Sequence, residues 1–506
     1  MPGAPSRNIH FFMFGIVLFA LSQYFGYEKI INLPPQSHHM WRQFDCLALT
    51  LNYYEGGMKF FEPRVYNDLT SNGYCAGEFP FVYYTVASAW KLTGVQYGIY
   101  RSVQLLIFYA GLFSLFALVW RSSKNVFYAY LVPVLLFTCP FIMLYAIGYL
   151  PDVPSLSFSF IGINMLHKYS EEGKNKWLFP AGIALALAVM IKANAMILVI
   201  ALFIMFVLAK WVFSFRDGPG KESLKLPLLY TFLAVFTSFF AWYLWAVMYN
   251  TKHDGFYLAT GTWPGWKIWE ARPEEIQKNS EKFIQYLSDF GHPWFLWFIV
   301  ACFALMLIRF FSRNYFAWLC MILFCGLAFF YAYFFVGFIN NNYYYVNMMS
   351  LPVLLMLGCI IAYPRLFGNL LVKSFFVYLV YLNLQQDKIM ENVYYHEGWG
   401  HEHYAEIYYE PGFKKFIDTY IPADNKVISI PDFIPNGTLS LMRRHGLSQY
   451  GFHDFVLRNW QMKQKQKRGY ACLVVRGDDW LRDSVLQHYI SKPVAQYKDV
   501  RIFDLQ

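Results

Sequence analysis

Eleven mostly apolar segments dominate this sequence, and they constrain the fold more than any other feature. A helix needs about 20 such residues to cross the hydrocarbon core of a bilayer. Inside that core the backbone finds no water, so its polar groups must pair within the segment, as they do in an α-helix. We therefore predict an α-helical polytopic membrane protein with about 11 transmembrane helices, at residues 9–27, 102–120, 126–149, 154–168, 177–191, 194–213, 226–249, 293–311, 315–338, 346–363 and 370–385.

The composition supports a membrane protein. Hydrophobic residues make up 57% of the chain and charged residues 15%, whereas soluble globular proteins contain roughly 45–50% and about 25%. Of the net charge of +10, all but one unit falls before residue 386, among the apolar segments. Positive charge in that setting indicates membrane orientation and argues against a nucleic-acid partner.

The connections between the segments differ in length and in charge. By the positive-inside rule, the N-terminus and the short connections rich in Lys and Arg lie in the cytoplasm. The long connections at 28–101 and 250–292, and the residues after 385, are then external. Because no A-x-A cleavage site follows the first segment, we expect it to be a helix and not a signal peptide. The short basic connections are at 121–125, 167–176, 210–225, 309–314 and 364–369.

The last part of the chain has a different pattern. Alternating strands and helices predict a small external α/β domain at 386–506. The transmembrane domain then covers 1–385 and carries the external loop 28–101. We expect the C-terminal domain to pack on the external face and shape access to a site. Its expected strands are 426–430, 470–475 and 500–505, and its expected helices are 411–420, 453–467 and 479–489.

The first external loop is far longer than a connector needs, and long ordered loops are usually functional. Within it, Asp45 and Glu78 stand among aromatic residues that would exclude water. A carboxylate in such surroundings can act as a base toward a hydroxyl nucleophile. The alternative is that both are polar residues of the membrane interface.

Two further signals lie at membrane boundaries. Asp152 follows the third segment in YLPD (149–152), where a broken helix next to an acid is typical of a site wall; it also suits a helix cap. Lys192, in MIKANAM (190–196), lies between two apolar segments. It either snorkels to water or pairs with an anion such as a lipid phosphate.

The sequence NNNYYYVN (340–347) gathers amides and phenols at the external start of the tenth segment. Asn342, Tyr344 and Tyr345 can hydrogen-bond a sugar or a phosphate. An interfacial aromatic belt is the alternative interpretation.

The cluster HEGWGHEH (396–403) contains three histidines, but its spacing does not match a standard zinc site. The sequence therefore identifies no metal-binding residues. Cys46 and Cys75 are the cysteines of the first external loop. An oxidising exterior would permit a disulfide between them, although sequence does not decide pairing.

The order of these motifs resembles that of the integral-membrane GT-C glycosyltransferases, specifically the bacterial relatives of the protein O-mannosyltransferases and the lipid A aminoarabinose transferases. The resemblance covers residues 1–385 and implies a GT-C-like fold. The motifs are WRQFD (41–45), GEFPFVYY (77–84), YLPD (149–152), IKANA (191–195) and NNYYYVNMMSLP (341–352).

The resemblance also implies an activity. The family takes its sugar from a polyprenyl-phosphate donor, with no nucleotide sugar, and passes it to an acceptor hydroxyl on the external face. The acceptor is a glycolipid, a glycan or a protein, and a single displacement inverts the anomeric centre. The membrane is then the bacterial inner membrane, with the C-terminal domain in the periplasm.

By the same resemblance, Asp45 is the base, Asp152 is a second carboxylate of the cavity, and Arg42 and Lys192 bind the donor phosphate. Glu78 matches the family motif loosely, because relatives often carry a basic or histidine-containing motif there. A divalent metal ion would assist the same step, and the sequence does not decide whether one is needed.

Two other functions share some of these features. A lipid transporter or flippase would show inverted repeats and paired broken helices, and the two halves of this sequence show no convincing repeat. An oligosaccharide ligase would use the same kind of lipid-linked donor and would move a preassembled glycan.

Overall fold

The computed structural model divides into two compact units, which interleave along the chain. The first unit comprises Met1–Asn32, Arg101–Tyr243 and Gly261–Asn392, and the second comprises Leu33–Tyr100, Leu244–Thr260 and Val393–Gln506. The residues that the structure describes are 7–36, 38–69, 71–212, 215, 225–255, 258, 266–395, 401–452, 457–490 and 492–505.

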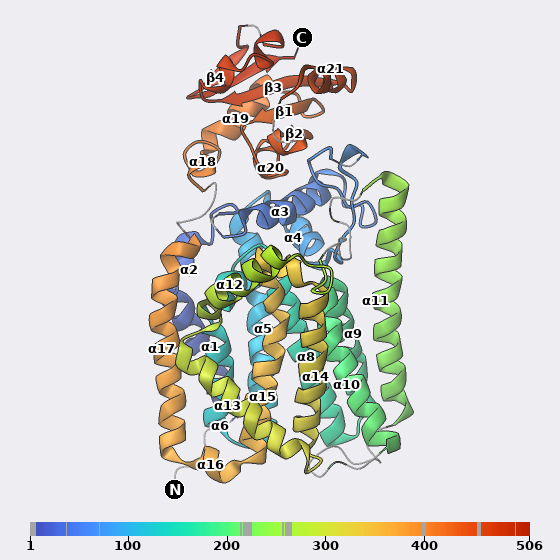
Figure 1. Cartoon of the computed structure of the whole chain (residues 1–506), viewed down its shortest axis with the longest axis vertical. Coiled ribbons are helices and arrows are strands. Elements are labelled where there is room, and N and C mark those ends of the chain that lie inside the picture. The colour runs from blue at the N-terminus through green and yellow to red at the C-terminus, as the bar shows by residue number, and fades with distance from the viewer. Residues whose placement is uncertain are drawn as a thin grey trace. The chain divides into compact units, whose positions relative to one another are not determined.

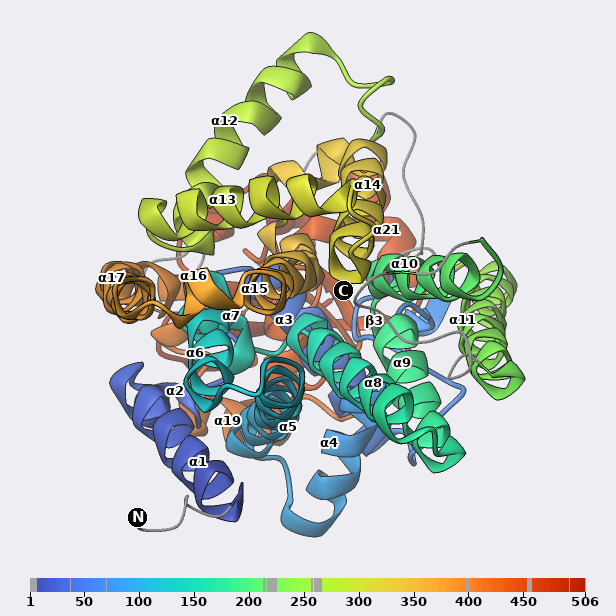
Figure 2. The same ribbon diagram turned by 90° about the horizontal axis from the view of Figure 1, so that it is seen from below.

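The first unit is a bundle of α-helices, and each of the eleven apolar segments coincides with helical structure (Figure 1). Figure 2 shows several of these helices nearly end on, including α15 and α17. The helices are α1 (Arg7–Tyr24), α2 (Tyr27–Ile30), α5 (Tyr97–Ser123), α6 (Val126–Phe137), α7 (Pro140–Ala146), α8 (Asp152–Glu172), α9 (Leu178–Ile191), α10 (Met196–Val207), α11 (Leu226–His253), α12 (Pro273–Phe290), α13 (Pro293–Phe310), α14 (Tyr315–Tyr333), α15 (Ser350–Ala362), α16 (Pro364–Gly368) and α17 (Leu370–Tyr395).

Several of these helices are long and apolar enough to cross a membrane, which confirms the polytopic helical fold. Among the described residues six meet that requirement, or seven if the bent pair α6 and α7 counts as one span. The predicted number of eleven is therefore not reached by length and apolarity alone. The pair bends by 79°, where Pro140 begins α7 after an extended Cys139. Other predicted segments form helices too short to meet the requirement; α9, for example, has 14 residues.

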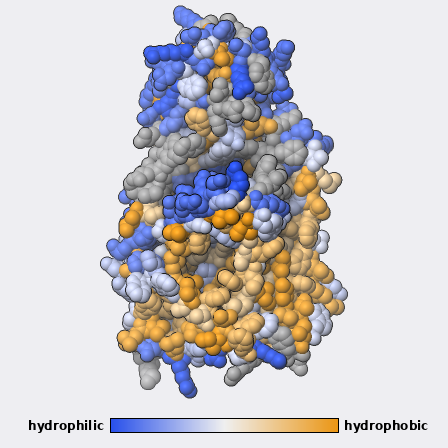
Figure 3. Space-filling model, in the orientation of Figure 1, coloured by the Kyte–Doolittle hydropathy of each residue, from blue (hydrophilic) through white to orange (hydrophobic). Residues whose placement is uncertain are grey.

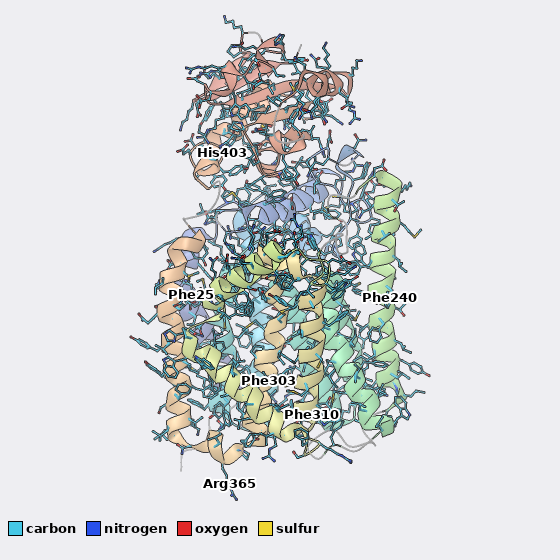
Figure 4. The ribbon with its side chains drawn as sticks, viewed as in Figure 1. Phe25, Phe240, Phe303, Phe310, Arg365 and His403 are labelled. Carbon is cyan, nitrogen blue, oxygen red and sulfur yellow. The ribbon has the colours of Figure 1, made fainter. Side chains whose placement is uncertain are left out.

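The outer surface of the bundle suits lipid. Apolar residues cover much of the helical surface of the first unit (Figure 3). Large side chains such as Phe240 on α11 are 57% exposed, which would be costly in water. Figure 4 shows Phe303 and Phe310 along α13 and Arg365 at one end of the bundle, in α16.

The second unit combines helices of the first long loop with a mixed sheet. The strand order is β2-β1-β3-β5-β4, with β1 parallel to both β2 and β3 and with β5 antiparallel to both β3 and β4. Ile428, Leu473 and Phe503 lie in its buried core. The elements are α3 (Met40–Glu55), α4 (Phe81–Thr93), α18 (His401–Ala405), α19 (Pro411–Tyr420), α20 (Gly437–Met442), α21 (Asn459–Lys467), β1 (Lys426–Ile430), β2 (Gly446–Ser448), β3 (Tyr470–Arg476), β4 (Ala495–Tyr497) and β5 (Val500–Asp504).

The first loop joins this sheet through its backbone. Gly446 of β2 donates its N–H to the carbonyl of Tyr66 at 3.0 Å and accepts from the N–H of Asp68 at 2.7 Å. A Cβ atom at Gly446 would lie 1.9 Å from the carbonyl oxygen of Val427, so a glycine is required. Asp68 adds an ion pair to Lys426 at 2.9 Å. The loop and the C-terminal residues therefore fold as one body.

The small α/β domain is confirmed, with corrections in detail. The predicted helix 411–420 and strand 426–430 coincide with α19 and β1, and α21 is shorter than predicted, with residues 453–456 outside the described residues. The predicted helix 479–489 is wrong, because two short 3₁₀ turns occupy it. Asp483 explains the break: its carboxylate accepts from the N–H groups of the second and third residues after it, at 2.9 and 3.0 Å, which competes with a continuous helix.

A fully buried carboxylate, Asp432, organises the turn between β1 and α20. It accepts from the N–H of Ile434 at 2.9 Å, and from the N–H and hydroxyl of Thr438 at 2.8 and 2.6 Å. The hydroxyl of Tyr404 also donates to it. These donors compensate for the lost water and fix the backbone that presents Asn436.

Asp432 is expected to make the stability of the second unit depend on pH. Burial raises the pKa of Asp432 from 3.8 to about 6, so between these values the folded state holds a proton that the unfolded chain releases. Stability then falls by roughly 3 kcal/mol as pH rises through that interval. Thermal unfolding midpoints across this range test the slope. The Asp432→Asn variant should flatten the profile, and an unchanged slope in that variant would contradict the assignment.

Candidate functional site

The predicted site residues fall into two groups, one in each unit. In the second unit, Arg42 and Asp45 lie one helical turn apart on α3, so they share a face. A guanidinium nitrogen of Arg42 lies 3.8 Å from a carboxylate oxygen of Asp45, whose side chain is 4% exposed. A buried carboxylate of this kind requires such a partner.

Glu78 joins the same group from the segment that precedes α4. Arg42 donates to Glu78, and the hydroxyl of Tyr83 on α4 donates to the same oxygen of Glu78. Burial lowers the pKa of Arg42, but the attractions of Glu78, Cys46, Tyr83 and Asp45 together outweigh burial, so the pKa of Arg42 is raised. Arg42 is therefore a fixed cation that connects two carboxylates.

Asn436 completes this group, and sequence analysis did not identify it. Its amide nitrogen donates to Asp45 at 2.8 Å, while its amide oxygen accepts from the backbone N–H groups of Tyr66 and Asn67 at 3.2 and 3.0 Å. The amide thus joins the C-terminal residues to α3 and to the first loop. In the sequence, Asn436 and the glycine after it follow Pro435, and an Asn-Gly pair predicts a turn. It does not predict a contact with a residue 391 positions away.

The two cysteines of the first loop are both free and buried. The thiol of Cys46 lies 3.3 Å from the hydroxyl of Tyr83, and burial raises the pKa of Cys46 to about 12. Burial also raises the pKa of Cys75. Neither thiol has the thiolate character of a reactive cysteine.

In the first unit, Asp152 and Lys192 form an ion pair with 3.3 Å between nitrogen and oxygen. Asp152 begins α8 and is fully buried, while Lys192 follows the last residue of α9 in an extended conformation. The ammonium group also lies 5.2 Å from the centre of the Tyr343 ring, within reach of a cation–π interaction. Two sequence motifs, YLPD and IKANA, therefore meet in space.

Two asparagines that the sequence analysis did not select link the segments that carry this group. Asn194 donates to the carbonyl of Tyr344 at 3.1 Å and accepts from Asn347 at 2.9 Å. Asn347 in turn accepts from the hydroxyl of Ser155 at 3.2 Å. Both lie within quoted motifs, and a polar residue next to a long apolar run was the signal that could have found them.

The remaining predicted residues, Asn342, Tyr344 and Tyr345, lie in one 3₁₀ turn, at 342–345. Asn342 is buried; it accepts from the hydroxyl of Tyr145 and donates to Asp289 at 2.8 Å. Tyr345 packs against aromatic rings, with its centroid 4.7 Å from that of Phe338. The structure thus brings Asp152, Lys192, Asn342 and Tyr344 close in one region of the first unit, and it surrounds Tyr345 with aromatic side chains.

The sequence does not decide whether the protein binds a divalent metal ion. Within the ranges that the structure describes, no group of three or more His, Cys, Asp or Glu side chains is arranged to hold a metal ion. His396 and Glu397 of the histidine cluster lie outside those ranges. His403 (Figure 4) has a pKa lowered to about 4, first by burial and then by Arg476, so it is a neutral packed side chain at pH 7.

Comparisons with known proteins agree with the resemblance read from the motifs. Residues 78–245 match the family described as dolichyl-phosphate-mannose-protein mannosyltransferase. Comparison with curated protein sequences gives no match.

Solved structures extend the likeness to nearly the whole chain. ArnT from Cupriavidus metallidurans matches in the apo state and bound to undecaprenyl phosphate, with TM-scores of 0.62 and 0.59, identities of 11% and 12%, and 97% of each chain covered. The oligosaccharyltransferase AglB from Archaeoglobus fulgidus, in complex with an inhibitory peptide and a dolichol-phosphate, matches with a TM-score of 0.54 and 12% identity over 92% of this chain and 69% of its own. At these identities the likeness establishes the fold, and the predicted GT-C resemblance is confirmed.

The contact between Asn436 and Asp45 predicts energetic coupling. In Asn436→Ala, the Asp45 carboxylate and two backbone N–H groups lose a partner, so the free energy of unfolding should fall by about 2–4 kcal/mol. A double-mutant cycle with Asp45→Asn should give a coupling energy of roughly 1 kcal/mol or more. Asn459→Ala, at an exposed asparagine of the same unit, is the control. Strict additivity of the two changes would contradict the contact.

The Asp152–Lys192 pair predicts a different pattern. Lys192→Met leaves the buried carboxylate without this cation and should destabilise the protein by about 3 kcal/mol. Adding Asp152→Asn to that variant removes the buried charge and should restore most of the stability. Thermal unfolding in detergent measures both, and a double variant as unstable as the single one would count against the pair.

Proposed function

We propose that this chain, whose residues 78–245 match the mannosyltransferase family and whose fold is that of GT-C glycosyltransferases, transfers a sugar from a polyprenyl-phosphate donor to an acceptor hydroxyl. The observation that carries the proposal is the buried Asp45 carboxylate, held by Arg42 on one oxygen and Asn436 on the other. A carboxylate fixed in this way is suited to act as a base.

On the acceptor side, Asp45 takes the proton of the acceptor hydroxyl as its oxygen attacks the anomeric carbon. Arg42 and Asn436 stabilise and orient the carboxylate, so both are positioning residues in this proposal. Arg42 pairs with Glu78, and we therefore assign it and Glu78 to the support of Asp45 and not to the donor phosphate. Glu78 has two donors on one oxygen, which suits a fixed support.

On the donor side, the bond between the anomeric carbon and the phosphate oxygen breaks, and its electron pair goes to the phosphate. Negative charge that develops there needs a cation. Lys192 supplies it, with Asp152 fixing the position of the ammonium group. Asn342 and Tyr344 lie in the same turn and are the proposed polar contacts of the donor. A single displacement of this kind inverts the anomeric centre.

The proposed setting is a bacterial inner membrane. The basic short connections support a cytoplasmic N-terminus and, with it, external C-terminal residues. The acceptor is a glycolipid, a glycan or a protein that presents its hydroxyl on the external face. ArnT was solved bound to undecaprenyl phosphate and AglB in complex with a dolichol-phosphate, which supports a lipid-linked donor for this chain.

Asp45→Asn is expected to lower transfer about 10²–10⁴-fold, the usual contribution of a general base. The assay uses the purified chain, a panel of radiolabelled polyprenyl-phosphate sugars, and membrane extract as the source of acceptor. Asp424→Asn, at an exposed carboxylate of the same unit, should retain full transfer. Parallel reactions with EDTA test the divalent metal ion.

Full transfer by a folded Asp45→Asn protein would refute the role of Asp45. If no donor supports transfer and the protein instead moves labelled lipid between leaflets, a flippase replaces the proposal. Transfer from lipid-linked oligosaccharides alone identifies an oligosaccharide ligase.

A further inference from the structure

The second unit contains a charged cavity that the proposed mechanism does not use. Its volume is about 600 Å³, within the range of small-molecule sites. Its walls come from the end of α3, the segment that follows α3, α19, and the residues between α20 and β2. We infer that this cavity binds an anionic sugar of the acceptor, through the phosphate or carboxylate group that the sugar carries. The inference rests on the proposed function, which it extends to the choice of acceptor.

Charge is the first argument. Five cationic side chains line the cavity against three carboxylates, an excess of two positive charges. The carboxylates already have partners: Glu62 lies 3.2 Å from Lys59 and 3.4 Å from Arg64, and Asp418 lies 3.0 Å from Arg444. The excess positive charge therefore favours an anion from outside the chain.

The crowding of cations gives a second argument. Burial, together with Arg443 and Arg444, lowers the pKa of Lys414 although Asp418 opposes the shift. Burial also lowers the pKa of His445, and Arg64 acts in the same direction. Neighbouring cations thus add to burial in disfavouring positive charge at the cavity wall, and an anion bound there would relieve the part that comes from repulsion.

The two arginines of the wall have different roles. Arg444 is 4% exposed and donates to the carbonyls of Ile421 and Met442, so it holds the backbone in place. Arg443 is 29% exposed and forms an ion pair with Glu55 at 3.7 Å, which is longer than a hydrogen bond. Because its guanidinium can take up a bidentate oxyanion, Arg443 is the recognition residue.

The cavity and the proposed base share the helix α3. Asn52 and Glu55, at its wall, lie 7 and 10 positions after Asp45 on α3, which is about 10–15 Å along a helix. Tyr66 also lines the cavity, and its N–H donates to Asn436, which binds Asp45. In this proposal the acceptor is held by its anionic group in the cavity, and a hydroxyl about this distance farther along the molecule is the one presented to Asp45.

Binding of simple probes tests the inference without the transfer reaction. Ligand-observed NMR on the purified full chain should show that glucose 6-phosphate and glucuronate bind, whereas glucose does not. Arg443→Gln should weaken both by about ten- to a hundredfold, since hydrogen bonds to charged groups contribute about 1.5–3 kcal/mol. Lys415→Gln, one position from Lys414 on α19 and exposed, should bind like the native chain.

The probes distinguish a phosphate from a carboxylate ligand, and an anionic sugar from other ligands of the cavity. If only glucose 6-phosphate binds, the cavity recognises a phosphate group; if only glucuronate binds, it recognises a carboxylate. Equal binding of glucose, or of inorganic phosphate, would overturn the inference, as would preference for a phosphoserine peptide. Unchanged binding by both Arg443→Gln and Lys414→Gln, with native unfolding midpoints, would also overturn it.

The transfer assay separates this inference from the proposed function. If the chain is a transferase, Arg443→Gln should raise the KM for an anionic acceptor and leave kcat and the donor KM unchanged. Anionic sugars that bind through Arg443 in a chain without transfer activity would support the cavity and refute the transferase. If the chain transfers sugar but Arg443→Gln does not change the KM for the acceptor, the transferase would be supported and the role of the cavity refuted.

Discussion

Charged groups that leave water must find partners, and this requirement organises both units of the protein. Asp152 is fully buried and has Lys192 at 3.3 Å. Asp45 has Arg42 and Asn436, and Asp432 has four donors around one turn. Lys192 for Asp152, Asn436 for Asp45 and Tyr404 for Asp432 each come from a different element than the carboxylate, so these pairings fix how the elements pack as well as where the carboxylate points.

The second unit shows how one side chain can link distant parts of a chain. Asn436 follows a turn that Asp432 holds rigid, and its amide satisfies Asp45 on α3 as well as two backbone groups of the first loop. The backbone hydrogen bonds of Gly446 with Tyr66 and Asp68 join the same loop to β2. The turn between β1 and α20 therefore supplies the amide that orients the proposed base.

Much of the fold was predictable, because membrane helices and buried strands leave clear hydropathy patterns. Each apolar segment is helical, and β1 and α19 have the predicted bounds. The helix predicted at 479–489 was wrong because hydropathy does not reveal that Asp483 binds its own backbone. The short strands β2 and β4, with three residues each, carry too little pattern to be read.

The sequence by itself determined the class of the protein, since long apolar segments permit few folds, and it supplied the residue types that a glycosyl transfer needs. Tertiary structure alone decided which of them meet. Arg42 with Glu78, Asp152 with Lys192, and Asp45 with Asn436 pair across 36, 40 and 391 positions. Local propensity contains no information about such contacts, because they depend on how whole elements pack. The cavity lined by Arg443 exists for the same reason: its walls come from segments that meet only in the folded chain.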